Sequence, residues 1–155
     1  MTRTGQSSLQ RQLQRGGALD PAAFDRDALT ALAHDQGLTL CVADCDRARS
    51  RSAVLRAIAN AVDFPEYFGG NLDALYDCLC DTVLDQKTGV VLMLHKLHSG
   101  DPALSEDAAR IESVCADAAE FARENARIFA YAIEHAGRHP EPEPGRAQSW
   151  SATGE

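Results

Sequence analysis

Long apolar runs are missing from this sequence. No hydrophobic stretch approaches the roughly 18 consecutive apolar residues of a membrane-spanning helix. The first residues, MTRTGQSSLQRQLQRGG, also lack the apolar stretch of a signal peptide, which favours a cytoplasmic protein. At 155 residues the chain is long enough for one domain with a core but short for two. We therefore expect one globular domain that does not bind membranes.

Positive charge is also scarce. The chain has 15 Lys and Arg against 23 Asp and Glu, for a net charge of −8. Binding of a nucleic acid backbone needs Lys and Arg to neutralise phosphates, so this deficit argues against direct nucleic acid binding. A negative surface suits a cationic partner, although it also serves solubility.

The C-x-x-C pair typical of zinc sites is absent, as is the phosphate-binding motif G-x-x-x-x-G-K-[ST]. His95 and His98, at the end of an apolar run, are only a weak metal signal without companion ligands. We expect no cofactor and no metal, and reduced thiols because no secretory signal accompanies the five cysteines. These cysteines are Cys41, Cys45, Cys78, Cys80 and Cys115.

Both ends of the chain have a composition typical of disorder. Residues 1–18 are rich in Gln, Gly, Ser and Thr and are predicted to be disordered. Residues 137–155 alternate Pro with Glu and then become small and polar, which predicts an extended tail with Trp150 exposed.

Helices and apolar strands alternate between these ends. Residues 19–37 predict an additional N-terminal helix, with Asp20 as the N-cap, Pro21 at the first helical position and Gly37 as the stop. Three further helices are expected, from Ser50 or Ser52 to Pro65, after Asn71, and over Ser105–Glu124. The apolar runs that predict buried strands are Leu38–Ala43, Gly89–His95 and Arg127–Ile133. This alternation indicates an α/β fold with a small parallel sheet covered by helices.

The stretch FPEYFGGNLDALYDCLCDTVLD, residues 64–85, predicts a helix with Asn71 as its N-cap. One face is apolar, and the opposite face carries an aspartate at every fourth position with no Lys or Arg between Arg56 and Lys87. Each like-charged i, i+4 pair costs roughly 0.2–0.5 kcal/mol. The four aspartates are Asp73, Asp77, Asp81 and Asp85. The row is either a solvated face or a docking surface for a basic partner. Catalysis is disfavoured, because these acids would raise the pKa of Cys78 and Cys80.

The run from Pro65 to Leu79, with its P-E-Y-aromatic-G-x-N-L-D-A-L-aromatic-D-C-L pattern, resembles the signature of the barstar family. These are intracellular protein inhibitors of secreted bacterial ribonucleases. The order of elements from Leu38 to about Ile133 is similar too, and implies a three-stranded parallel sheet within a barstar-like domain over residues 38–136. The resemblance implies that the chain is an inhibitor or immunity protein and not an enzyme. With no second apolar face in view, we expect a monomer.

The resemblance also implies roles for individual residues. Asp77 would be the main acid, placed where the ribonuclease binds a substrate phosphate, and Asp73 would meet a second cationic group. Tyr67 would give an aromatic contact and Asn71 would support it. Tyr76 would belong partly to the core and partly to the contact. One further acid would come from the long helix; Glu120 is the first choice, with Asp117 and Glu124 as alternatives.

Some residues depart from the family pattern. Asp81 and Thr82 replace a Gly-Trp pair of the best-known member, and Gly70 replaces an acid, so Asp81 adds a carboxylate to the expected contact surface. Barnase therefore need not be the partner, and a different ribonuclease or nuclease toxin would suit the altered edge. Two alternatives stay open: an acidic adaptor that docks on a basic protein other than a nuclease, and a metal protein or enzyme that uses the histidines and cysteines.

Overall fold

A computed structural model describes residues 2–64 and 70–139 of the chain. In chain order these residues form α1 (Thr2–Arg15), β1 (Gly17–Leu19), the 3-10 helix η1 (Pro21–Ala23), α2 (Arg26–Asp35), β2 (Leu38–Asp44), α3 (Arg51–Val62), α4 (Leu72–Asp85), β3 (Gly89–Leu97), α5 (Ser105–Glu124) and β4 (Ile128–His135). None of these helices is both long and apolar enough to cross a bilayer. The α/β class is confirmed.

The sheet is parallel throughout, with the strand order β1-β4-β3-β2. Leu38 of β2 pairs with Gly89 of β3, which pairs in turn with Ile128 of β4. These are the three strands expected from the apolar runs. The expected number of strands is corrected to four, because Gly17 of β1 pairs with Ala130 and adds a short edge strand. A strand of three residues is too short to be detected as an apolar run.

The N-terminal region also differs from the expectation. In place of the disordered segment predicted for residues 1–18, the structure has α1 followed by β1, and both Leu9 and Leu13 are buried. Gly16 has a φ of 78°, and a Cβ there would lie 3.2 Å from the carbonyl oxygen of Phe129. Glycine therefore lets the chain leave the helix and pass close to β4. The polar composition hid these contacts, because two leucines suffice to dock α1 once a sheet face is available.

The helix expected over residues 19–37 is divided in two. The carboxylate of Asp20 caps only η1, where it accepts a hydrogen bond of 3.0 Å from the backbone N–H two residues later. Asp25 is the N-cap of α2, and accepts a hydrogen bond of 2.7 Å from the Ala28 backbone N–H. Gly37 follows the end of α2 with a φ of 74°, as expected of a helix stop.

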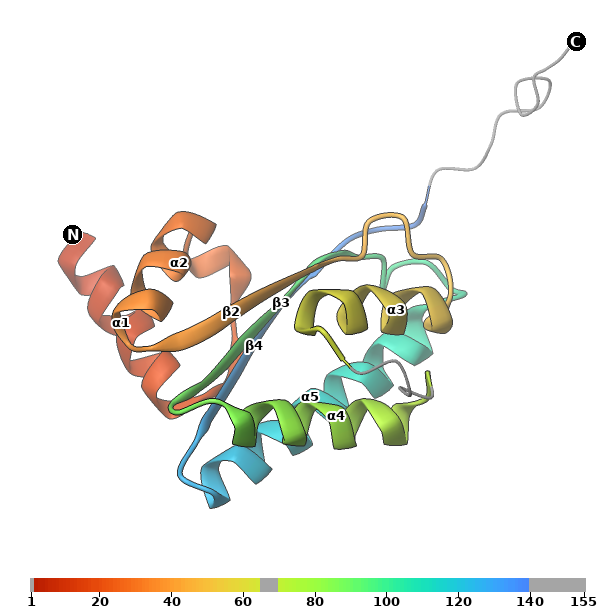
Figure 1. Ribbon diagram of the computed structural model, residues 1–155. Helices are drawn as coiled ribbons and strands as arrows, with labels where there is room; N and C mark the ends of the chain where they lie inside the picture. Colours follow the sequence, from red (N-terminus) through yellow and green to blue (C-terminus); the bar gives the residue numbers. More distant parts are fainter. Residues whose placement is uncertain (1, 65–69, 140–155) are drawn as a thin grey trace, which may run out of the picture.

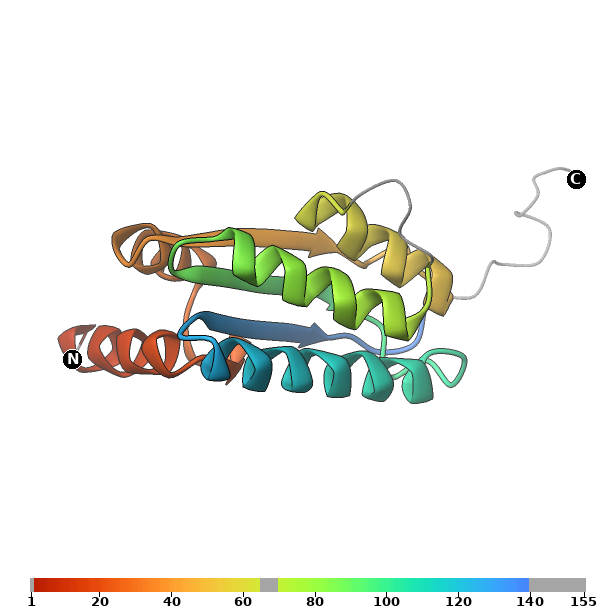
Figure 2. The ribbon, with the colours of Figure 1, turned by 60° about the horizontal axis from the view of Figure 1, so that its bottom comes forward.

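Helices cover both faces of the sheet (Figure 1). Helices α3, α4 and α5 pack on one face, and α1 and α2 on the other. Along β3, Leu92 and Leu94 belong to the first core, whereas Val91 and Met93 belong to the second. Burial on both faces explains why β3 is continuously apolar in the sequence. Figure 2 shows α4 and α5 running along the same side of the sheet.

The last described residues are packed against the domain. Residues 137–139 were expected to belong to the disordered tail, yet His139 is buried and its ring stacks on that of His98, with 3.8 Å between the centroids. The remaining prediction for the tail, including Trp150, concerns residues 140–155, which lie outside the described residues.

Candidate partner-binding groove

Local sequence determines where α4 begins and which face it buries. The backbone N–H of Ala74 donates a hydrogen bond of 2.7 Å to Oδ1 of Asn71, the N-cap. The apolar side chains of Leu75, Leu79 and Val83 are buried in the core under α4. The predicted helix and its apolar stripe are confirmed. Because this stripe is buried, the opposite face of α4 points toward solvent.

The four aspartates of α4 are exposed on that outward face. Within residues 2–64 and 70–139, none of them forms an ion pair or a side-chain hydrogen bond with a basic residue. Only Asp73 lies in the first turn, where the helix dipole favours negative charge. The charges of Asp77, Asp81 and Asp85 are therefore uncompensated within the described part of the chain.

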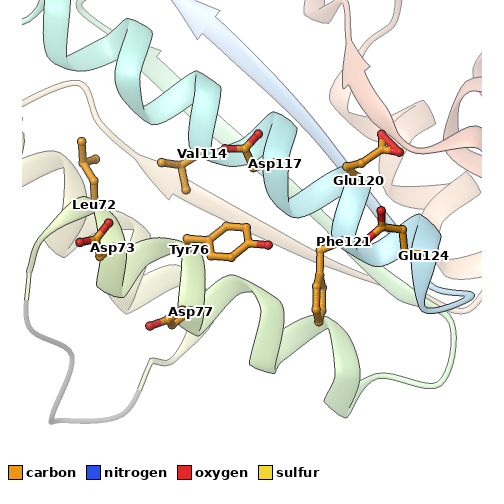
Figure 3. A pocket seen from close by; sticks show the side chains of 9 residues that line it. All are labelled: Leu72, Asp73, Tyr76, Asp77, Val114, Asp117, Glu120, Phe121 and Glu124. Atoms are coloured by element: carbon orange, nitrogen blue, oxygen red, sulfur yellow. The ribbon is translucent and has the colours of Figure 1, made fainter.

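A groove of about 610 Å³ lies between α4 and α5 (Figure 3). Its apolar lining consists of Leu72 and Tyr76 from α4 and Val114 and Phe121 from α5, all half-buried. The rings of Tyr76 and Phe121 meet edge to face, at 6.5 Å between centroids and an interplanar angle of 75°. This aromatic contact joins the two helices across the groove.

Five exposed carboxylates surround the apolar lining, two from α4 and three from α5. They belong to Asp73, Asp77, Asp117, Glu120 and Glu124. The sequence left open which acid of the long helix would accompany Asp77, and the structure places all three candidates at the groove. Glu120 alone among the five has an ion pair within the described residues, since Nη1 of Arg123 donates to its Oε1 at 2.6 Å.

The phenol of Tyr76 lies within this negative field. Its pKa is raised, chiefly by its hydrogen bond with Cys80, and further by burial and by the charges of Asp117 and Glu124. Tyr76 is therefore a neutral hydroxyl at physiological pH. The groove therefore contains an aromatic ring and a neutral hydroxyl between two acidic walls.

The surroundings of the two thiols of α4 disfavour the thiolate form. Burial raises the pKa of Cys78, and the charges of Asp81 and Asp77 raise it further. Burial also raises the pKa of Cys80, against a lowering effect of its hydrogen bond with Tyr76. Both side chains stay protonated and buried at neutral pH, whereas nucleophilic catalysis needs an accessible thiolate.

Two other residues expected at the site lie outside the groove lining. Asp81 is exposed on α4 beyond the groove lining, and Asn71 acts as the helix cap. Tyr67 falls outside the described residues. Phe121 has no role among the sequence-based expectations. It lies seven residues after Val114 and therefore on the same side of α5. Asp117 and Glu124 are also seven residues apart. This seven-residue spacing could have predicted which residues of α5 form the second wall of the groove.

The histidines considered as metal ligands contact other groups. Nε2 of His98 lies 2.8 Å from a carboxylate oxygen of Asp46. Nδ1 of His95 is hydrogen-bonded to Glu134 and lies 3.1 Å from Nη2 of Arg26. In the part of the chain that the structure describes, no three His, Cys, Asp or Glu side chains are arranged to hold a metal ion. All five cysteines are buried and outside disulfides.

Comparison with known proteins identifies the family. A family model described as Barstar (barnase inhibitor) matches residues 38–134, a range that includes α4, α5 and the whole groove. Helices α1 and α2 and strand β1 precede the matched range. No curated protein sequence matches the chain. Because the match covers more than half of its length and contains the acidic groove, the chain belongs to the barstar family.

Proposed function

We propose that this protein inhibits a basic ribonuclease or nuclease toxin by blocking its active site with α4 and the groove between α4 and α5. It would act inside the cell as protection or immunity. The observation that carries the proposal is the concentration of five exposed carboxylates around one apolar, aromatic groove. Membership in a family described by barnase inhibition supports the same conclusion.

Charge complementarity gives the physical basis of this proposal. Ribonuclease active sites collect Arg, Lys and His, which bind phosphodiesters and stabilise the charge that develops in the transition state. Carboxylates held on two packed helices can occupy the positions of those phosphates without presenting a bond to cleave. Long-range attraction would speed the encounter, and desolvated ion pairs would slow dissociation.

Each candidate residue has a proposed role. Asp77 would be the main phosphate mimic and Asp73 a second anionic contact, with the ring of Tyr76 packing between them and α5. Glu120 would contribute from the opposite wall, where Asp117 and Glu124 also stand. Asp81 would contact the partner from outside the groove. Asn71 would hold the start of α4, and Tyr67 would add an aromatic contact from the segment that precedes it in the sequence.

The test combines capture with inhibition. The full chain is used to capture proteins from the lysate of its own organism, and the recovered proteins are identified by mass spectrometry. Inhibition of RNA cleavage is then measured for the recovered nuclease and for barnase. We expect Asp77→Ala to weaken the complex by at least about 2 kcal/mol, because it leaves a cationic group of the partner buried without its counter-ion.

The matched control is Asp85→Ala, which removes an exposed aspartate from the same helix outside the groove. It should leave inhibition within about threefold of wild type, since distant surface charges act only through a screened field. Equal effects of the two substitutions would contradict the groove as the binding site. Capture of a basic protein that is not a nuclease would instead support the acidic adaptor.

A further inference from the structure

Among the described residues, Glu120 differs from the other four groove carboxylates because it forms an ion pair. Nη1 of Arg123, one helical turn later on α5, donates to Oε1 of Glu120 at 2.6 Å. In the view of Figure 3 the Glu120 side chain extends away from Asp73 and Asp77. Arg123 is not part of the groove lining. Its guanidinium is linked to the groove by the ion pair with Glu120.

We propose that Arg123 lowers the affinity of the groove for a cationic partner by competing for Glu120. In the uncomplexed protein the Arg123 guanidinium binds the Glu120 carboxylate. On binding, a cationic side chain of the partner takes the place of this guanidinium. This inference rests on the proposed function and assigns a regulating residue to the same site. It predicts that the natural sequence does not have the tightest binding that this groove allows.

The exposure of the pair makes such an exchange feasible. The Arg123 and Glu120 side chains are 50% and 60% exposed, so water can replace either partner as the other leaves. An exposed ion pair of this kind is weak, because solvent screens it and both side chains lose conformational freedom. A partner arginine that binds Glu120 in a desolvated interface would form the stronger contact.

Arg123 also lowers the negative potential at one end of the groove. Among the described residues, the lining contains five carboxylates and no basic side chain, so a single adjacent positive charge offsets an appreciable part of the negative potential. Attraction between oppositely charged surfaces raises association rates, and a positive charge at the groove edge reduces that gain. Both effects of Arg123, competition and repulsion, oppose the binding of a cation.

The chain offers a matched control on the same helix. Arg110 pairs with Glu106 at 3.5 Å, with side-chain exposures of 54% and 80%, and neither residue lines the groove. Arg110→Ala therefore removes the same charge and a similar ion pair at a distance from the site. Circular dichroism and thermal melting would first establish that Arg123→Ala and Arg110→Ala are folded.

Association and dissociation rates are then measured with barnase, or with the captured nuclease if barnase is not bound. At low ionic strength we expect Arg123→Ala to associate about two- to fivefold faster than wild type, and Arg110→Ala to match wild type. High salt should reduce the difference. Binding of Arg123→Ala that is unchanged or weaker, or an equal gain for Arg110→Ala, would overturn the inference while leaving the proposed function in place.

A double-mutant cycle tests the exchange itself. If the partner displaces Arg123 from Glu120, the loss of affinity caused by Glu120→Ala is larger in the Arg123→Ala background than in wild type. Equal losses in the two backgrounds would mean that the Glu120–Arg123 pair persists in the complex, which contradicts the exchange. Failure of the wild-type chain to bind either nuclease would overturn the proposed function and this inference together.

Discussion

Single residues on α4 show a conflict between the stability of the uncomplexed protein and the proposed binding of a partner. Asp77 lies one turn from both Asp73 and Asp81, and all three are exposed. Like charges at this spacing destabilise a helix by roughly 0.2–0.5 kcal/mol per pair. No base among the described residues compensates this row, which is consistent with the proposed binding of a basic partner. Strain of this kind is expected where a site is built for a partner.

Asp77→Asn should therefore stabilise the uncomplexed protein. It removes two repulsive pairs and keeps the size of the side chain, so the free energy of unfolding should rise by about 0.4–1 kcal/mol at low ionic strength. Urea denaturation at neutral pH measures this value, and 0.5 M salt should reduce the gain.

Asp73→Asn is the control for this prediction. It removes one repulsive pair but also loses a favourable interaction with the helix N-terminus, which is worth about 0.3–1 kcal/mol. Its stability should therefore be equal to or below that of wild type. A clear loss of stability in Asp77→Asn would mean that the carboxylate makes a stabilising contact within the fold.

Among the elements, α1 and α2 cover a face of the sheet that no helix of the matched family range covers. Leu9 and Leu13 of α1 belong to a second core with Met93 of β3 and Ala132 of β4. The groove belongs to α4 and α5 on the other face. The sheet therefore separates the N-terminal elements from the proposed binding site.

Leu13→Ala tests whether α1 is an integral part of the fold. Leu13 is fully buried, with 0% exposure, so the truncation should lower the free energy of unfolding by about 2–4 kcal/mol. The exposed neighbour Gln14→Ala should change it by less than about 0.5 kcal/mol. Nuclease binding should be unaltered in both variants. An unchanged urea midpoint for Leu13→Ala would show that α1 contributes nothing to global stability.

At the level of the whole molecule, a pair of histidines joins three segments that are distant in the sequence. Nδ1 and Nε2 of His98 face the carbonyl of Gly137 and the carboxylate of Asp46. The ring of His139 lies between Asp101 and the backbone carbonyl of Asp46 and stacks on His98. Because both nitrogens of His98 face acceptors, the doubly protonated ring satisfies more hydrogen bonds than the neutral ring.

These contacts predict the pH dependence of stability. The pKa of His98 is raised from 6.5, chiefly by its hydrogen bond with Asp46, so its contribution is complete below pH 6.5 and is lost as the pH rises through the folded-state value. Hydrogen bonds lower the pKa of Asp46 and Asp101 from 3.8, so their contributions are lost only as the pH falls below that value. Stability should be greatest between about pH 4 and pH 6.5.

Urea midpoints measured from pH 5 to pH 8.5 test the upper limb of this profile. The midpoint of wild type should fall above pH 6.5, whereas that of His98→Gln should be lower and nearly constant. His34→Gln is the control, because His34 is an exposed residue of α2, and it should follow wild type. If His98→Gln kept the wild-type slope, another group would be responsible for the pH dependence.

The features predicted correctly from the sequence are those that depend on neighbouring residues. The Asn71 cap, the apolar stripe of α4 and the aspartate row opposite it follow from spacings of three and four residues along one helix. The three long strands are continuous apolar runs, because helices bury both of their faces. The fold class and the α4 wall of the groove could therefore be derived without coordinates.

The remaining features depend on contacts between distant segments. The local sequence of residues 1–18 does not predict that Leu13 packs against the second face of the sheet. It also does not predict that Gly16 allows β1 to pair with β4. The second wall of the groove likewise exists only because α5 packs beside α4, which brings Asp117 and Glu124 opposite Asp77. The 3.6-residue periodicity of a helix identifies its exposed face. Which other element lies beside that face is decided by packing between segments far apart in the chain.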